Sequence, residues 1–355
     1  MRRILVAVLL GLGLAQAAAA QDLRERAQAY FSPIPQEPPA FEGRTPEKVE
    51  LGKLLYLDRR LSQSQAISCN SCHDLGLAGA DLQQTSIGHG WQFGSRNAPS
   101  TFNAVFHIDQ FWDGRADTLA DQAAGPIANP IEMASTHEAS VEVLETIPGY
   151  APYFEAAFPG EETPITLDNV TDAIAAFEST LITPNSAFDR WLEGDDAALS
   201  QDQKAGLVLF IDTGCVACHT GTALGGESYR KFGVVELPSE KVLPRGDTGR
   251  MQVTGEKADE YVFKVASLRN IALTRPYFHS GAVWELDEAV KIMAKSQIGT
   301  DISESQASRI ATFLDSLTGE QPQGPYPALP PSVNETPRPD PVGGLENIGR
   351  SPAGH

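Results

Sequence analysis

Two copies of the motif C-x-x-C-H constrain this chain more than any other feature of its sequence. The first copy lies in "SCNSCHDL" and the second in "GCVACHTG". In proteins with c-type haem, the two thiols of this motif form thioethers with the porphyrin, and the adjoining histidine becomes an axial ligand of the iron. The residues that would hold the two haems are Cys69, Cys72 and His73 for the first, and Cys215, Cys218 and His219 for the second.

The cysteine count supports this interpretation. The chain has 4 cysteines, and all of them fall inside the two motifs. A local disulfide and a zinc site are the alternatives, but zinc needs four ligands and usually unites two C-x-x-C pairs. Each pair here has its own histidine, so the sequence predicts two covalently bound haem c groups.

The first twenty residues, "MRRILVAVLLGLGLAQAAAA", have the plan of a secretory signal peptide, with two arginines, an apolar run and an alanine-rich end. Cleavage after residue 20 would leave an exported protein, which predicts a periplasmic location; an uncleaved anchor is the alternative. No later segment approaches the roughly 20 apolar residues of a membrane span, so we expect no stable membrane insertion. The formal net charge of −19 makes nucleic acid and anionic membranes poor partners.

Helix signals precede both motifs. Thr45 can cap a helix whose first residue is Pro46, and Ser200 with Gln203 forms a capping-box pattern. The apolar faces of these two helices would consist of Leu51, Leu54 and Leu55 in the first and Leu207, Phe210 and Ile211 in the second. A helix before each motif is expected of a duplicated cytochrome c module. The predicted fold is therefore mostly α, with two cytochrome c-like haem domains in tandem.

Apolar periodicity predicts further helices at about 138–147, 166–183, 285–296 and 303–318, and strand-like alternation is limited mainly to "YVFKV". Residues 184–199 are expected to join the two domains. The predicted organisation is a signal peptide at 1–20, an N-terminal haem domain at 21–183, a C-terminal haem domain at 184–319, and a proline- and glycine-rich tail at 320–355, which is expected to be extended or mobile.

The sixth ligand of each iron decides whether the chain only carries electrons or also reacts. The histidines outside the motifs are His89, His107, His137, His279 and His355, and the methionines after signal removal are Met133, Met251 and Met293. Met293 lies on an apolar helical stripe and is either a core residue or a ligand that raises the haem potential. His89 lies between Gly88 and Gly90, in a loop whose backbone can change conformation at low cost; a solvated loop histidine is the alternative.

The chain resembles the bacterial dihaem cytochrome c peroxidases over nearly its whole mature length. The runs that carry the resemblance are "SCNSCHDL", "IGHGWQFGSRNAPSTFN", "FWDGRADTL", "NPIEM", "CVACHTG" and "LRNIALTRPYFHSGAVWELDEAVKIM". The resemblance implies that the N-terminal haem, with His73, is the peroxidatic one. It also implies that His89 is a distal ligand that departs to open the iron to peroxide.

The resemblance assigns three further roles. Glu132 matches the acid/base glutamate, which would take a proton from one peroxide oxygen and return it to the other; a surface or structural carboxylate is the alternative. The C-terminal haem would be the electron-transferring one, ligated by His219 and Met293, with Met251 as the second candidate. Trp112 matches the tryptophan between the haems, and a packed interface aromatic is compatible with that role.

The resemblance also implies a calcium ion between the domains, bound by Asn97, Thr274 and Pro276. Backbone carbonyls supply some of these ligands, so the sequence itself carries little trace of the site. His279 falls in a run that the family shares, and a structural or haem-pocket role is expected for it.

The reaction implied is reduction of hydrogen peroxide to water, with electrons from a small periplasmic cytochrome c or a cupredoxin, by an enzyme that forms a homodimer. One alternative is a related dihaem enzyme that oxidises residues of a partner protein during its maturation; that enzyme has tyrosine where this sequence has Met293. The other is a dihaem electron carrier without catalysis. Met293 and His89 count against the first alternative, and Glu132 with the His89 loop against the second.

Overall fold

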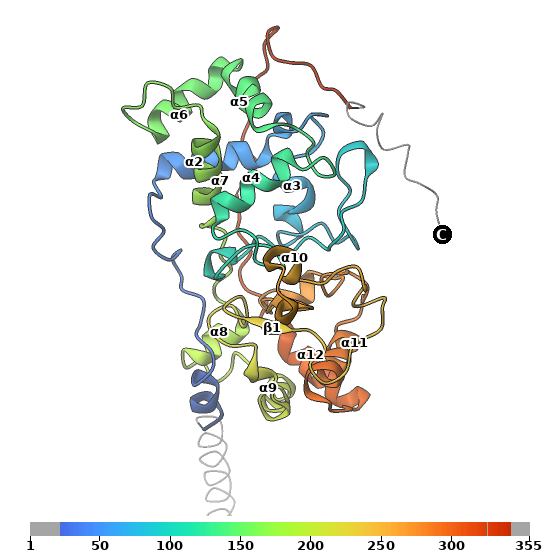
Figure 1. Ribbon diagram of the computed structural model, residues 1–355. Coiled ribbons are helices and arrows are strands. Elements are labelled where there is room, and N and C mark those ends of the chain that lie inside the picture. Colours follow the sequence, from blue (N-terminus) through green and yellow to red (C-terminus); the bar gives the residue numbers. More distant parts are fainter. Residues whose placement is uncertain (1–21, 325, 342–355) are drawn as a thin grey trace, which may run out of the picture.

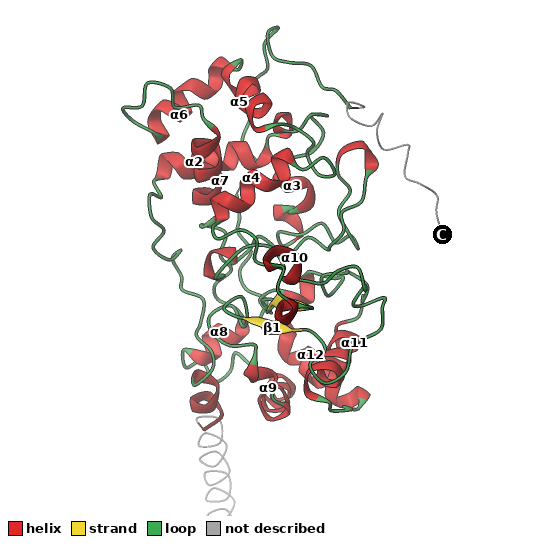
Figure 2. Cartoon of the chain, viewed as in Figure 1, coloured by secondary structure: helices red, strands yellow, loops and turns green. Residues whose placement is uncertain are grey.

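The computed structural model describes residues 22–324 and 326–341, which form two lobes stacked end to end (Figure 1). The predicted signal peptide at 1–20 lies outside the described residues, as do residues 342–355 of the predicted tail. Helices and long loops make up both lobes, and strands are few (Figure 2). Within the described part of the chain, no helix is both long enough and apolar enough to cross a membrane. The mostly α fold predicted from the sequence is confirmed.

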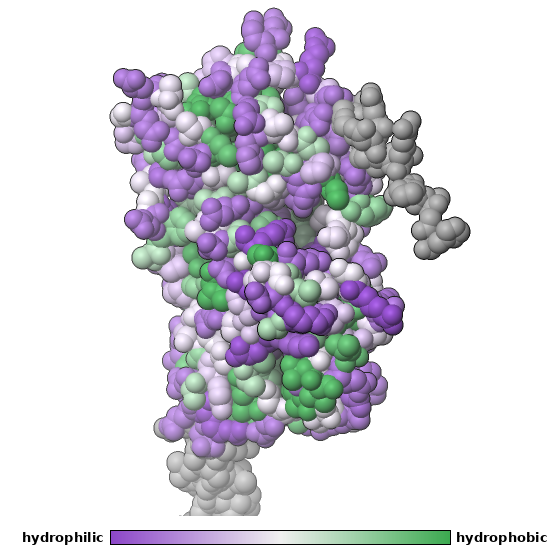
Figure 3. Space-filling model, in the orientation of Figure 1, coloured by the Kyte–Doolittle hydropathy of each residue, from purple (hydrophilic) through white to green (hydrophobic). Residues whose placement is uncertain are grey.

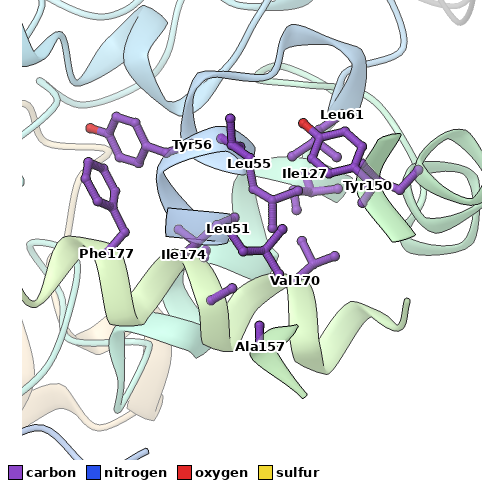
Figure 4. Close-up of a cluster of buried hydrophobic side chains, with 14 of the residues drawn as sticks. Leu51, Leu55, Tyr56, Leu61, Ile127, Tyr150, Ala157, Val170, Ile174 and Phe177 are labelled. Atoms are coloured by element: carbon purple, nitrogen blue, oxygen red, sulfur yellow. The ribbon is translucent and has the colours of Figure 1, made fainter. Parts of the chain in front are cut away.

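The upper lobe is built around two crossing helices, α2 (Pro46–Leu57) and α7 (Leu167–Glu178). The Thr45 side chain accepts a hydrogen bond from the Lys48 amide and caps α2, as predicted. Figure 4 shows the apolar side chains between the two helices, among them Leu51 and Ile174. The other helices of this lobe are α3 (Cys69–Cys72), α4 (Leu119–Ala128), α5 (His137–Glu145) and α6 (Ala151–Ala157).

The lower lobe repeats this plan with α9 (Gln201–Thr213) against α12 (Glu304–Asp315). The predicted capping box of Ser200 and Gln203 is present at the start of α9. Other helices of this lobe include residues 22–28, α8 (Ala187–Leu192), α10 (Met251–Thr254) and α11 (Leu286–Met293), which continues into a π-helical turn (Ala294–Ile298). Strands β1 (Tyr229–Lys231) and β2 (Val262–Lys264) form an antiparallel pair, with Tyr229 opposite Lys264.

A glycine lets the backbones approach closely at each main crossing. A Cβ atom on Gly52 of α2 would lie 1.8 Å from the Ala173 carbonyl oxygen of α7. A Cβ atom on Gly206 of α9 would lie 2.1 Å from the Arg309 carbonyl oxygen of α12. In each lobe, the helix before the haem motif therefore makes a close backbone-to-backbone contact with a helix that comes after the motif.

The helix predictions are mostly correct. The patterns at 138–147 and 303–318 correspond to α5 and α12, and the pattern at 285–296 covers α11 and part of the π-helical turn. The prediction for 166–183 is too long, because α7 ends at Glu178. Helices α3, α4, α6, α8 and α10 were not predicted, and α8 lies inside the segment expected to join the lobes.

The N-terminal and C-terminal segments of the described chain each run from one lobe to the other. Leu23, Ala27 and Phe31 pack in the core of the lower lobe, although their sequence position suggested the N-terminal domain. The tail is extended and runs back along the upper lobe (Figure 1), where Arg60 donates a hydrogen bond to the Pro330 carbonyl at 2.8 Å. The face drawn in Figure 3 is largely hydrophilic, with a hydrophobic patch low on the lower lobe.

Candidate functional site

The first haem motif opens onto a cavity of about 410 Å³ in the upper lobe. Cys72 and His73 line this cavity, together with Glu132 and Trp112. The His73 Nδ1 atom lies 2.9 Å from the Pro99 carbonyl oxygen. A carbonyl can only accept, so Nδ1 carries the proton, and the lone pair of Nε2 is left for a metal.

Glu132 is a half-buried carboxylate on the wall of the first cavity. The Asn129 amide donates a hydrogen bond to its Oε1 atom at 2.9 Å. Burial raises the pKa of Glu132, while the nearby Arg115 charge and the Asn129 hydrogen bond oppose that rise. A carboxyl group with a raised pKa exchanges protons more readily near neutral pH than an ordinary glutamate does.

The predicted distal residue, His89, is buried but does not line the first cavity. Its amide donates a hydrogen bond to the Glu132 carbonyl at 2.8 Å, so the loop that carries it is fixed to the Glu132 segment. A Cβ atom on Gly88 would lie 2.1 Å from the Ile131 carbonyl oxygen, which shows how closely the two segments pack. The next residues reach the surface, with Trp91 84% exposed.

The second haem motif opens onto a separate cavity of about 270 Å³. Cys215, Cys218, His219 and Met293 all line it. The His219 Nδ1 atom lies 3.0 Å from the Leu224 carbonyl oxygen, so its Nε2 lone pair is also left for a metal. Met251, the second candidate, lines neither cavity, which favours Met293 as the methionine ligand.

Trp112 lines both cavities. Its Nε1 atom donates a hydrogen bond to the Asn97 carbonyl at 2.9 Å, and its ring meets the His279 ring edge to face at 6.2 Å. His279 is buried and stacks on Phe263 at 4.3 Å. Burial lowers the pKa of His279 to about 4, so this imidazole is neutral at physiological pH.

An ion-pair network joins the lobes beside Trp112. Arg96 donates to Asp247 through Nε at 2.7 Å and through Nη2 at 2.6 Å, and to Asp113 through Nη1 at 2.5 Å. Asp113 follows Trp112 in sequence, whereas Asp247 belongs to the lower lobe. This network fixes the tryptophan relative to both cavities.

The predicted calcium residues Asn97, Thr274 and Pro276 all line the second cavity. The Asn97 amide nitrogen donates to the Gln83 carbonyl at 2.9 Å. Among the described residues, no three side chains of histidine, cysteine, aspartate or glutamate converge as metal ligands.

Two charged residues on the cavity walls were missed in the sequence. Glu178 is buried on the wall of the first cavity, and Lys264 lines the second. His107, one of the histidines considered as a sixth ligand, also lines the second cavity. Glu178 follows Ile174 by four residues and so lies on the apolar stripe of its helix, where a glutamate is conspicuous. Lys264 is a charged residue within the otherwise apolar run "YVFKV", which is a similar signal.

The residues present fit haem. All four cysteines are free thiols, both motif histidines have Nδ1 bound to a backbone carbonyl, and both cavities have largely apolar walls. A zinc site would require four converging ligands, which neither motif has among the described residues. Fold and site thus define a helical protein with two separate places for covalently attached haem.

Comparison with known proteins agrees with this class. A family profile described as di-haem cytochrome c peroxidase matches residues 46–197. The chain is 51% identical to cytochrome c551 peroxidase from Pseudomonas aeruginosa, over 91% of this chain and 94% of that protein. It is 52% identical to cytochrome c551 peroxidase from Nitrosomonas europaea, over 84% of this chain and 88% of that protein.

A solved structure shares the fold, that of a MauG-like protein associated with microbial copper homeostasis. It has a TM-score of 0.69 and 28% sequence identity, and the match covers 81% of this chain and 93% of that chain. From the sequence identities above, the chain belongs to the di-haem cytochrome c peroxidase family.

Proposed function

We propose that this protein reduces hydrogen peroxide to water, with electrons delivered one at a time by a small cytochrome c or a cupredoxin. The observation that carries the proposal is the asymmetry of the two cavities. The first has Glu132 on its wall and no methionine among its described lining residues, whereas the second has Met293 beside His219. One site is thus equipped for proton transfer and the other for electron transfer.

Each lobe would be a cytochrome c-like domain with one haem c, attached through Cys69 and Cys72 in the first and Cys215 and Cys218 in the second. Haem iron beside His73 would supply the redox chemistry that cleaves the O–O bond. The overall reaction consumes one peroxide, two electrons and two protons and yields two waters. The rest of the catalytic work falls to the side chains of this chain.

Glu132 would accept a proton from one peroxide oxygen and donate it to the other, so that the departing oxygen leaves as water. The Asn129 hydrogen bond to Oε1 orients the carboxylate, and partial burial raises its pKa toward the working range. Trp112, which lines both cavities, would couple them electronically. His89 would be the displaceable ligand; its buried position outside the first cavity, with its amide bonded to the Glu132 carbonyl, agrees with a displaced state.

We further propose a calcium ion held by Asn97, Thr274 and Pro276, whose common position on the second cavity supports the assignment. A periplasmic location is supported by the signal-peptide pattern of residues 1–20, and a homodimer by the family resemblance. Met293 on the second cavity disfavours the maturation type of dihaem enzyme, for which tyrosine is expected there.

The test is oxidation of reduced cytochrome c by peroxide, catalysed by the wild-type protein and by Glu132→Gln. We expect the variant to keep both haems and to lose about 10²-fold or more in turnover, because the amide cannot carry the proton. Glu142→Gln, an exposed change on α5, is the matched control and should retain full turnover.

Two results would count against the proposal. Turnover of Glu132→Gln at the wild-type rate would remove Glu132 from the reaction. If neither the fully oxidised nor the half-reduced wild-type protein consumed peroxide, only the electron-carrier alternative would be left.

A further inference from the structure

The second cavity has a positive wall in a strongly acidic protein. Its described lining residues include no aspartate or glutamate, but they include Arg230, Lys264 and Arg269. The formal net charge of the chain is −19, so composition alone would predict more acidic than basic residues on a cavity wall. Such a cavity favours a ligand that carries negative charge.

Two of the three cations are accounted for by other contacts. Arg269 is buried and forms an ion pair with Asp189, with Nη1 2.7 Å from Oδ1. Arg230 is exposed to solvent, and its Nη1 atom donates to the Tyr229 carbonyl at 2.8 Å. Neither of these groups requires a partner inside the cavity.

Lys264 differs from both arginines. It is 9% exposed, and its ammonium donates to the Asp109 carbonyl at 2.7 Å. No carboxylate oxygen of the described residues forms an ion pair with it, and the Asp109 carboxylate is already engaged by the Tyr229 hydroxyl. A buried ammonium that no carboxylate contacts is costly, because burial removes its hydration, and the more distant Asp109 and Asp113 charges offset only part of that loss. The same burial lowers the pKa of Lys264 to about 8.

His107 adds a second unsatisfied donor to the same wall. Its Nδ1 atom lies 3.3 Å from the Lys264 ammonium, which can only donate, so Nδ1 is the acceptor and Nε2 carries the proton. The Nε2 atom is buried and has no hydrogen-bond partner among the described residues. Burial and the adjacent Lys264 charge lower the pKa of His107, which keeps the ring neutral and preserves this arrangement.

We propose that Lys264 and His107 form a binding site for an ionised carboxylate of the haem group attached at Cys215 and Cys218, and that they position this group in the second cavity. The inference rests on the proposed function in placing a haem there and in assigning Met293 to it as a ligand. A haem c group carries two carboxylates, and the ammonium with the Nε2–H group offers one of them a charge-assisted hydrogen bond and a neutral one. A cation beside this haem would also stabilise the reduced iron and so raise the potential of the second haem.

The experiment compares the holoprotein with Lys264→Met and with Lys231→Met. Lys231 is the matched control, because it is an exposed lysine on β1, the strand paired with β2. Resonance Raman spectra are recorded on the half-reduced protein, in which the methionine-ligated haem is reduced first. We expect the propionate bending band of that haem to shift in Lys264→Met only, together with a lower midpoint potential, and Lys264→Arg to restore both partly.

If Lys264→Met does not load haem, Lys264→Gln gives the same test, since its amide can still donate to the Asp109 carbonyl. A band at the wild-type position in the folded Lys264 variant, or an equal shift in Lys231→Met, would overturn the proposal. Both readouts are taken without peroxide. Absence of peroxidase activity in the wild-type protein, together with a shifted band in Lys264→Met, would therefore refute the proposed function and leave the carboxylate site standing.

Discussion

Two glutamates line the first cavity, and their surroundings set them apart. Glu132 has a raised pKa that Arg115 and Asn129 hold back, which leaves it able to gain and lose a proton. Glu178 is fully buried on α7, and desolvation alone raises its pKa to about 8. A proton held on Glu178 at neutral pH keeps a second negative charge out of the cavity where peroxide would react.

The Glu178 pKa predicts a pH dependence of stability. Its folded value of about 8 lies above the ordinary value of 4.5, so between these pH values the folded protein keeps a proton that the unfolded chain has lost. The free energy of unfolding should therefore fall as the pH rises through this interval, by on the order of a few kcal/mol.

Glu178→Gln cannot ionise, so its thermal unfolding temperature should stay high where that of the wild type declines. The two proteins should converge toward pH 5. Unfolding followed by circular dichroism across this range checks the prediction, with the exposed change Glu142→Gln as control. Parallel curves for wild type and Glu178→Gln would show that Glu178 is not protonated in the folded protein.

At the scale of helices, one helix crossing stabilises the interior of each lobe: α2 with α7 in the upper lobe, and α9 with α12 in the lower lobe. We expect Gly52→Ala and Gly206→Ala each to cost about 1–3 kcal/mol or more, because the added Cβ atom meets a helix backbone that cannot move aside. Gly246→Ala is the control, since a Cβ atom there meets nothing within 4 Å. Thermal unfolding of the holoproteins measures the effect, and a wild-type unfolding temperature for Gly52→Ala would contradict the close crossing.

Local signals in the sequence sufficed for α2 and α9, but the capping box of Ser186 and Asp189 at the start of α8 was not recognised. Thr45 and Ser200 mark the starts of α2 and α9 because each satisfies an amide that the helix leaves free. The end of α7 was misplaced for a tertiary reason. Asn103 binds both the amide and the hydroxyl of Thr183 and so holds residues beyond Glu178 out of the helix.

The candidate site was predictable to a similar degree. Covalent haem attachment follows from motif spacing alone, and the roles of Glu132, Trp112 and Met293 came from family resemblance. The Lys264 and His107 pair could not be foreseen, because the two residues are 157 positions apart in the chain and only the fold brings β2 against the loop of His107. Helix α4 was missed because Gly125 and Pro126 lie inside it, and both residues usually interrupt a helix.

At the scale of the whole molecule, the lobes are tied by more than their contact surface. The first described residues pack in the lower lobe, the tail packs on the upper one, and Arg96 bridges Asp113 and Asp247. These connections keep the two cavities at a fixed separation. Trp112 is a side chain that both cavities share.

Electron transfer between the cavities should therefore depend on Trp112. In Trp112→Leu both haems should remain attached, since the thioether residues are untouched. Oxidation of the second haem, after peroxide is mixed with half-reduced protein, should slow at least about tenfold, equivalent to about 1.4 kcal/mol in the barrier. Trp112→Phe keeps an aromatic ring but loses the hydrogen bond to the Asn97 carbonyl, so its oxidation rate should lie between those of the wild type and Trp112→Leu.

Stopped-flow absorbance follows the reaction, with the exposed change Trp284→Leu as the control. An unchanged rate in Trp112→Leu would mean that electrons cross between the lobes by another route, with Trp112 serving only to pack the interface.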